Sequence, residues 1–268
     1  MFIRTGLAAT IGAALLDSVW FERYFIELNE FHIGTATPHT ANIRIVQISD
    51  LHLTSLTYQL TRLAKRINRL QPDLILLTGD AIDAAGNIAL LDSYLKLLDK
   101  KIKKVAILGN WEYWGNVDLS KLRQVYAANN CDLLVNQTRQ YSLRHKTVSI
   151  TGIDDYVGGK ADFSAATADY QPSDYHLILT HCPQYSEAIA SQINKDTAVD
   201  FVLSGHTHGG QVNVLGFVPF LPPGSGNYLK GWYRINSLKL YVSKGIGTSI
   251  LPLRFGARAE IALFNLLA

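Results

Sequence analysis

The sequence has few of the residues that build small cross-linked or strongly charged proteins. Its 268 residues include only two cysteines, Cys131 and Cys182, which lie far apart and outside any CxxC spacing. We therefore expect two buried free thiols and no disulfide framework. Charged residues make up 18% and the net charge is +3, which does not by itself indicate nucleic-acid binding. With 48% hydrophobic residues, the chain can bury a substantial core, in one large domain or two small ones.

Long hydrophobic runs are also lacking. The apolar run Thr5–Leu16 is shorter than the roughly 20 residues that a membrane-spanning helix needs. It has the length of a signal-peptide core, but no clear cleavage site follows it. Helix-like spacing continues after it through Phe21, Tyr24, Phe25 and Leu28. We expect residues 1–42 to form an apolar helical segment and linker, which either lies on a membrane surface or packs on the domain.

From residue 43 onward, short apolar runs alternate with amphipathic patterns, which predicts one α/β domain over residues 43–268. In the first half we expect strands at 43–48, 74–77 and 105–108, and helices at 60–70, 88–98 and 119–128. In the second half we expect strands at 148–153, 175–180, 201–203, 238–242 and 261–264. Two sheets flanked by helices fit this pattern better than one sheet.

Potential metal ligands follow five of the expected strands. They lie in Asp50-Leu-His52, Gly79-Asp80, Gly109-Asn110, Thr180-His181 and Gly205-His206-Thr-His208. Sites in such sheets form beyond the carboxyl ends of the strands. Oxygen and imidazole ligands suit Mn, Fe or Zn better than Ca, and the lack of cysteine argues against a structural zinc site. Seven groups are too many for one ion but suit two ions that share a carboxylate, a clamp for in-line attack at phosphorus.

This series of motifs resembles the signature of the calcineurin-like metallophosphoesterase superfamily over roughly residues 43–266. The resemblance implies a four-layer α/β/β/α sandwich of two mixed sheets flanked by helices, and two divalent metal ions, with Mn²⁺ preferred over Fe or Zn. It implies that one metal is held by Asp50, His52 and His208, and the other by Asn110, His181 and His206. It also implies that Asp80 bridges the two ions, and that the catalytic residues are Asp80, Asn110 and His206.

Two further segments are similar to a bacterial branch of this superfamily that is often membrane-associated. They are Gly205–Gln211 and the tail 245–255. A minor departure is Ala-Arg-Ala-Glu260-Ile, where many relatives read Arg-Pro-Glu-Ile. The branch includes phosphodiesterases and UDP-2,3-diacylglucosamine pyrophosphatase-like enzymes. The resemblance therefore implies a metal-dependent phosphoric ester or pyrophosphate hydrolase that acts on a phosphate-containing small molecule or lipid. It also implies a bacterial protein bound to a membrane, peripherally or through its N-terminus, on the cytoplasmic side rather than exported.

The third motif departs from the superfamily. It reads Gly109-Asn110-Trp111-Glu112, and the usual histidine, generally taken to protonate the leaving group, is replaced by Trp111. An indole cannot titrate. General acid catalysis typically contributes about 10²–10⁴-fold and matters most for poor leaving groups. Unless Glu112, Tyr113 or another histidine supplies the proton, the sequence favours a pyrophosphate or an activated diester as substrate.

Several residues are candidates for substrate binding. Trp111, Tyr113 and Trp114 could stack on a nucleobase or line an acyl-chain channel, or they could be core residues. Arg254 and Lys244 could bind phosphate, although Arg254 fits a salt bridge equally well.

The apolar segment Val212–Pro223 is interpreted as a loop that faces a lipid or the bilayer, or as an ordinary loop over the sheet edge. Among the remaining polar residues, Asp83 is interpreted as an acidic loop residue, and His145 and His176 as solvent or edge-strand histidines.

Two alternative functions remain open at this point. One is a phosphomonoesterase or nuclease with a soluble substrate. No basic stripe is evident in the sequence, so nucleic acid is not an expected partner. The other is a non-catalytic metal-binding scaffold, which only the residue at position 111 supports. We infer no protein partner, but we expect peripheral contact with a membrane.

Overall fold

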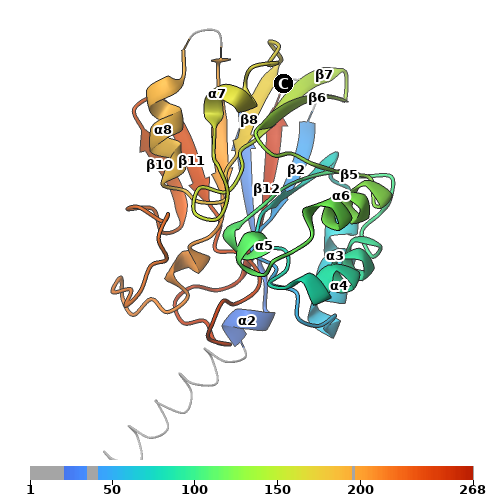
Figure 1. Cartoon of the computed structure of the whole chain (residues 1–268), viewed down its shortest axis with the longest axis vertical. Coiled ribbons are helices and arrows are strands. Elements are labelled where there is room, and N and C mark those ends of the chain that lie inside the picture. Colours follow the sequence, from blue (N-terminus) through green and yellow to red (C-terminus); the bar gives the residue numbers. More distant parts are fainter. Residues whose placement is uncertain (1–20, 35–41, 195–196, 268) are drawn as a thin grey trace, which may run out of the picture.

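The computed structural model describes residues 21–34, 42–194 and 197–267. Two six-stranded sheets pack face to face, and helices cover their outer faces (Figure 1). The strand order is β1-β12-β2-β3-β4-β5 in sheet A and β10-β11-β9-β8-β7-β6 in sheet B. This arrangement confirms the α/β fold class and the four layers that the sequence predicts.

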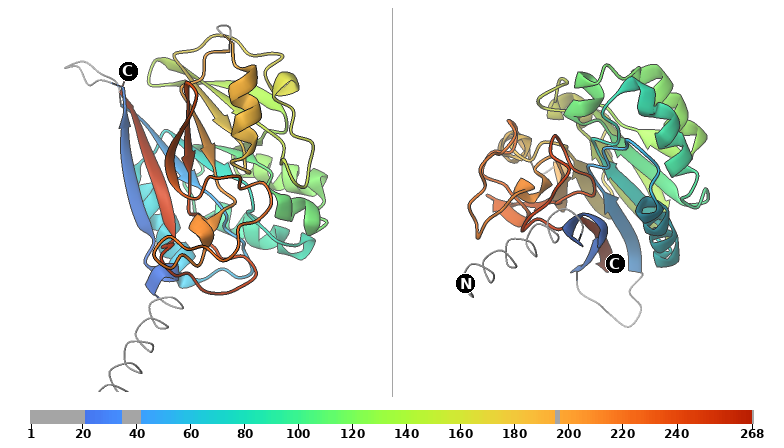
Figure 2. Two further views of the ribbon diagram at one scale, coloured as in Figure 1. Left: turned by 90° about the vertical axis from the view of Figure 1, so that its left-hand side faces the viewer. Right: turned by 90° about the horizontal axis from the view of Figure 1, so that it is seen from below.

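Sheet A is the half of the sandwich that contains the strands of the first βα units. Parallel pairing joins β2 (Asn42–Ile48), β3 (Leu74–Thr78), β4 (Lys103–Ile107) and β5 (Cys131–Leu133). On the other side of β2, antiparallel β12 (Glu260–Leu267) pairs in turn with parallel β1 (Glu27–Ile33). Its outer face is covered by α3 (Tyr58–Leu70), α4 (Ile88–Leu95) and α6 (Leu119–Ala128) (Figure 2, right).

Sheet B has a parallel centre between two antiparallel edges. The centre consists of β7 (Lys146–Gly152), β8 (Tyr175–Leu179), β9 (Phe201–Ser204) and β11 (Leu238–Val242). The edge strands are β6 (Gln137–Leu143) and β10 (Gly231–Ile235), each hydrogen-bonded antiparallel to its neighbour. The helices α7 (Phe163–Ala166) and α8 (Tyr185–Gln192) pack on its outer face.

Local sequence signals explain where the helices begin and end. The Thr57 hydroxyl accepts a hydrogen bond from Leu60 N (3.3 Å) at the start of α3, and Gln71 ends it in a left-handed conformation (φ 47°) just before Pro72. At the start of α6, the Asp118 carboxylate accepts hydrogen bonds from two backbone N–H groups. The buried face of α3 carries Leu63 and Ile67, so an amphipathic pattern with capped ends fixes the helix on the sheet.

The structure corrects several expectations. Helix-like spacing through Phe25 and Leu28 does not extend a helix, because α2 spans only Glu22–Tyr24 and β1 begins at Glu27. Since β1 is part of sheet A, residues 27–33 belong to the same sheet as the rest of the domain and not to a separate linker. The helix that begins at Ile88 ends at Leu95, before the expected residue 98. The strands β5, β6 and β10 were not predicted.

His176 is also misplaced by the sequence interpretation. It lies in β8, between β7 and β9, and is 1% exposed. Its ring nitrogens contact Ala198 O (3.0 Å) and the Thr151 hydroxyl (2.7 Å), and burial lowers its pKa to about 4. It is therefore a neutral core histidine, whereas His145 is exposed in the β6–β7 turn as expected.

The expectations for the two cysteines and for the N-terminal apolar run have different outcomes. Cys131 and Cys182 are buried free thiols, which confirms the prediction. The apolar run Thr5–Leu16 lies outside the described residues. In the part of the chain that the structure describes, no helix has the length and apolar character needed to cross a bilayer.

A buried carboxylate connects the two sheets. Glu260, the first residue of β12, is 1% exposed. Its Oε1 atom accepts a hydrogen bond from the Tyr241 hydroxyl (2.8 Å) in β11, and its Oε2 atom accepts one from Asn29 Nδ2 (2.6 Å) in β1 and lies 3.0 Å from Lys244 Nζ. Because Lys244 N also donates to Oε1 (3.0 Å), Glu260 satisfies four polar groups that lie on different strands or loops.

We expect Glu260→Ala to destabilise the fold by about 3–5 kcal/mol, because it leaves the Asn29 amide and the Tyr241 hydroxyl without their acceptor and leaves Lys244 with Glu27 as its one remaining ion-pair partner among the described residues. Urea unfolding of the two proteins measures the difference. Glu187→Ala, which removes an exposed carboxylate from α8, is the matched control and should change stability little. Equal stability of both variants would contradict the role given to Glu260.

Candidate metal centre

The seven predicted ligands meet at one edge of the sandwich. Asp50 and His52 follow β2, Asp80 follows β3 and Asn110 follows β4, all from sheet A. His181 follows β8, and His206 and His208 follow β9, all from sheet B. Each of the seven is buried. The site therefore depends on both sheets, which bring residues 50 and 208 together across the sandwich.

The structure groups six of these side chains into two clusters. Ligand atoms of Asp50, His52 and His208 lie within 4.8 Å of one another, and so do those of Asp80, His181 and His206. The Asp80 Oδ2 atom is 3.1 Å from His181 Nε2 and 3.7 Å from His52 Nε2, so this carboxylate faces both clusters. Such a position is the one that a bridging ligand of two metal ions must take.

Two buried oxygens fit a pair of cations. Asp50 Oδ2 and Asn110 Oδ1 have no hydrogen-bond partner among the described residues. A buried polar atom without a partner costs free energy, and such atoms are rare in native proteins. Both are hard oxygen ligands in a site that also contains imidazoles, and this is the mixed donor set of divalent Mn, Fe or Zn. The residues present therefore fit the two-metal centre that the sequence implies.

Hydrogen bonds outside the two clusters orient three of the histidines. His181 Nδ1 donates to Thr78 O (2.8 Å), and His206 Nε2 donates to Pro223 O (2.8 Å). His52 Nδ1 lies 2.5 Å from an Asp83 carboxylate oxygen. When such a ring is neutral, its second nitrogen carries no proton and faces the cluster, which is how outer partners prepare histidines for metal binding.

The backbone at the site is held in an uncommon conformation. Five ligands have positive φ, between 45° and 74°, and they are Asp50, His52, Asp80, His206 and His208. Residues other than glycine rarely adopt this region, and each such residue costs about 1–3 kcal/mol. From the sequence, only the neighbouring glycines were expected to take positive φ, and not the ligands themselves.

Glycines beside the ligands provide the space. A Cβ at Gly205 would collide with the Ser49 hydroxyl and with Asp50 Oδ2, and one at Gly109 would collide with Asp80 Oδ1. A Cβ at Gly245 would lie 2.7 Å from the Asp50 Cβ. The motif glycines are thus required for close approach to the ligands.

The charges of the cluster reinforce one another. Burial opposes ionisation of Asp80, but His181 and His52 outweigh it and lower the pKa of this carboxyl. Burial likewise opposes protonation of His181, whereas Asp80 raises the pKa of its ring above the ordinary value. Protons on His181 compete with a divalent ion for the same nitrogen, so metal affinity must fall as the pH is lowered.

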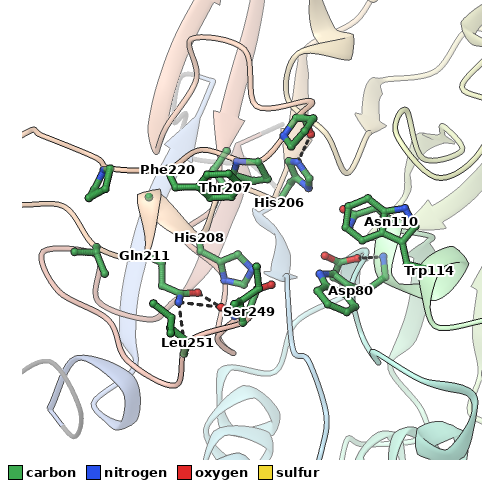
Figure 3. A pocket seen from close by; sticks show the side chains of 17 residues that line it. Asp80, Asn110, Trp114, His206, Thr207, His208, Gln211, Phe220, Ser249 and Leu251 are labelled. Carbon is green, nitrogen blue, oxygen red and sulfur yellow. Dashed lines mark hydrogen bonds between the residues drawn. The ribbon is translucent and has the colours of Figure 1, made fainter.

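A cavity of about 610 Å³ opens in front of the clusters. Asp80, Asn110, His206 and His208 form its polar floor. The rest of its wall is mostly apolar and includes Trp111, Trp114, Val212, Phe220, Ile250 and Leu251. In Figure 3, His206 and His208 lie between Asp80 and Asn110 on one side and Phe220 and Leu251 on the other. Val212–Pro223 is a loop, as the sequence predicts.

The predicted substrate-binding residues take different places. Trp111 and Trp114 line the cavity. Tyr113 does not, because its hydroxyl donates to Asp154 Oδ1 (2.5 Å). Arg254 is fully buried behind the site, where its guanidinium donates to Gly247 O and lies 3.3 Å from His208 Nδ1.

Two other candidates for phosphate or proton chemistry have structural partners. Lys244 pairs with Glu27 (2.7 Å) and Glu260 (3.0 Å). Glu112 accepts hydrogen bonds from the backbone N–H groups of Gly109 (2.8 Å) and Ala81 (2.7 Å), which tie the third motif to the second. Burial and the nearby Asp80 raise the Glu112 pKa to about 7, but its carboxyl is not part of the cavity wall.

Sequence reasoning missed the roles of Asp83 and of residues 249–251. Asp83 was interpreted as a loop acid, although it contacts His52. Its spacing of three residues after Asp80 was the available signal. Ile250 and Leu251 are 80% and 53% exposed at the mouth of the cavity. No periodicity marks them, because they lie in an irregular loop.

The family model for calcineurin-like phosphoesterases matches residues 43–210, more than half of the chain, and the chain belongs to this family. It is a metal-dependent phosphoester hydrolase by family, and its two clusters form a dinuclear centre for divalent ions. It is 31% identical to the uncharacterized metallophosphoesterase YkuE of Bacillus subtilis, over 97% of this chain and 92% of that protein. It is also 31% identical to the uncharacterized metallophosphoesterase YkoQ of the same organism, with 85% of each chain covered.

The fold has counterparts among solved structures. A 5'-nucleotidase precursor from Thermus thermophilus superposes with a TM-score of 0.54 at 14% identity, over 85% of this chain and 54% of that one. This likeness supports the two-sheet α/β architecture.

We expect Gly205→Ala to lower affinity for divalent ions by about 10–100-fold or more, the range seen when groups that position ligands are disturbed. The added methyl group displaces Asp50, and metal titration of the purified protein detects the loss. Gly86→Ala is the matched control, because nothing lies within 4 Å of a Cβ there. Unchanged metal binding in Gly205→Ala would refute the close approach described above.

Proposed function

We propose that this chain hydrolyses a phosphodiester or pyrophosphate bond in a substrate that carries a large apolar group, such as the nucleotide-linked lipid UDP-2,3-diacylglucosamine. One observation carries the proposal. A single cavity has metal-binding groups on its floor and an almost entirely apolar wall built from two loops and two tryptophans. Apolar cavities with a few convergent polar groups are typical ligand sites.

The metal ions are proposed to be manganese, with iron or zinc as the other candidates for this donor set. Asp50, His52 and His208 would hold one ion, and Asn110, His181 and His206 the other, with Asp80 between them. When bound, the two ions supply Lewis-acid stabilisation to the phosphoryl oxygens and to the attacking water. The protein positions the phosphorus above the floor, and the apolar wall excludes bulk water from it.

The residue at position 111 bears on the choice of bond. Trp111 N donates to Asp80 Oδ1 (2.9 Å), so its backbone positions the central carboxylate while its indole lines the cavity. Tyr113 and Glu112 are bonded elsewhere and offer no proton there. A phosphate leaving group needs little protonation, whereas an alkoxide needs much. The site is therefore suited to pyrophosphates and activated diesters.

The exposed residues at the mouth support work at a membrane surface. Phe220 is 65% exposed in one loop and Ile250 is 80% exposed in the other, and both line the cavity; Phe217, 70% exposed, lies in the same loop as Phe220. Clustered exposed apolar side chains mark interaction sites. We infer a bacterial enzyme in peripheral contact with the cytoplasmic side of a membrane, with the cavity open toward lipid.

We expect purified protein with Mn²⁺ to cleave bis-p-nitrophenyl phosphate and a UDP-linked lipid faster than p-nitrophenyl phosphate. Asp80→Ala should abolish all turnover, since it removes the carboxylate that faces both clusters. Release of nitrophenol or of the nucleotide product measures the rates. A preference for p-nitrophenyl phosphate would favour a soluble monoester substrate, and no turnover despite bound metal would favour a scaffold.

Trp111→His tests the leaving-group argument separately. A histidine at this position would add a proton donor, and general acids are worth about 10²–10⁴-fold with poor leaving groups. We expect cleavage of alkyl phosphodiesters to rise while pyrophosphate hydrolysis changes little. Trp114→His, at the exposed edge of the same cavity, is the control. It should change neither the cleavage of alkyl phosphodiesters nor the hydrolysis of pyrophosphate. A fall in both activities in Trp111→His would reject the account.

A further inference from the structure

The helix α3 carries an unusual concentration of positive charge. Its 13 residues include Arg62, Lys65, Arg66 and Arg69 and no acidic residue. Four positive charges on one helix exceed the net charge of +3 of the whole chain. Arg62, Lys65 and Arg69 are exposed, and Arg66 is half-buried. The expectation that the chain has no basic stripe is therefore wrong.

Three of these arginines line a groove of about 630 Å³. Its other side is formed by α2 and the start of β1, and Arg258 adds a fourth guanidinium. Aromatic rings lie among the cations, with Tyr24, Phe25 and Tyr58 in the wall. No predicted metal ligand is among the described residues that line this groove, so it is distinct from the metal centre. We refer to it as the arginine groove.

The cations of the arginine groove lack ion pairs with the acidic residues that the structure describes. Within the described residues, none of Arg62, Arg66, Arg69 and Arg258 forms an ion pair. Arg66 donates to Ile26 O (2.7 Å) and Arg258 donates to Phe25 O, and these hydrogen bonds fix both guanidinium groups in the wall of the groove. The single acid in the lining, Glu27, is bound to Lys244. Burial, then the nearby Arg69 and Arg258, lower the Arg66 pKa, so the cations repel one another.

The arginine groove joins the active cavity through a continuous surface. A hollow between them shares Tyr24 and Gln59 with the groove, and shares Ile250 and Leu251 with the cavity. Arg23 Nη1 donates to Pro252 O (2.7 Å), which fixes α2 beside the loop of residues 249–252. Figure 2 (left) shows α2 directly below the loops that surround the cavity. Cations and exposed apolar side chains thus lie on one face.

We propose that the arginine groove binds the phosphate groups of anionic membrane lipids and thereby turns the mouth of the active cavity toward the bilayer. Guanidinium groups match phosphate oxygens, and aromatic side chains favour the membrane interface. The exposed apolar residues Phe25, Ile250 and Leu251 continue the same face. Apolar side chains such as these enter lipid, whereas a nucleic acid would leave the aliphatic Ile250 and Leu251 uncovered, so lipid is the occupant that the surface fits.

Vesicle binding by the full-length protein tests the proposal without relying on catalysis. Cosedimentation is compared for phosphatidylcholine vesicles with and without phosphatidylglycerol. We expect tighter binding to the anionic vesicles, and a loss of about 10–30-fold in Arg62→Gln/Arg69→Gln, because each cation near such a surface contributes roughly a tenfold factor or less. Binding to neutral vesicles, to which the N-terminal apolar run can contribute, should be equal in both proteins.

Lys100→Gln/Lys101→Gln is the matched control, because it removes two exposed cations that do not line the arginine groove and should retain anionic binding. Turnover of bis-p-nitrophenyl phosphate should be unchanged in both variants, so failure of this proposal is separable from failure of the hydrolase assignment. Equal losses in the two variants, or no preference for anionic vesicles, would overturn it. Displacement from vesicles by inorganic phosphate at constant ionic strength would instead assign the groove to free phosphate, and displacement by an oligonucleotide to nucleic acid.

Discussion

The contact of the Asp80 carboxylate with both histidine clusters is the constraint around which the site is built. Asp80 Oδ2 faces His181 from sheet B and His52 from sheet A, while Asp80 Oδ1 accepts a hydrogen bond from Trp111 N. The Glu112 carboxylate stabilises the same turn, because it accepts a hydrogen bond from Asp80 N (3.1 Å). One carboxylate thus links the two sheets, and its position decides whether two ions can share a ligand.

Such a site opposes folding unless cations occupy it. Five ligands adopt left-handed backbone conformations, two buried oxygens have no hydrogen-bond partner in the part of the chain that the structure describes, and carboxylates and imidazoles are gathered out of water. Each of these features costs free energy. The surrounding sandwich offsets part of this cost. Buried strands in both sheets fix the loops that carry the ligands, and the glycines in these loops leave room for the ligand side chains. Metal binding then offsets the remaining cost, as in other proteins whose ligands are brought together by folding.

Much of this could be predicted from the sequence, and the reasons differ from residue to residue. Asp50, Asp80 and His206 each follow an apolar strand, so the βα pattern alone brings them to one edge. By contrast, Phe25 and Leu28 have helical spacing but lie on either side of the change from α2 to β1, where pairing with β12 decides the conformation.

The surface features were harder to predict. Arg254 was a candidate phosphate ligand, yet burial and carbonyl partners behind His208 determine its place. The arginine groove could not be predicted from the net charge of the chain, because acidic residues elsewhere offset the positive charge of α3. In addition, Arg258 is distant in sequence and comes close to α3 only in the folded chain. Long-range packing, which composition does not encode, therefore accounts for most of what the sequence could not show.

The central claim is that Asp80 bridges two metal ions. Electron paramagnetic resonance of the protein titrated with Mn²⁺ tests it most directly. We expect two ions per chain with a spectrum of an exchange-coupled pair, since a shared carboxylate brings such ions to about 3.5–4 Å. A single ion per chain, or two ions with uncoupled spectra, would contradict the bridging role of Asp80.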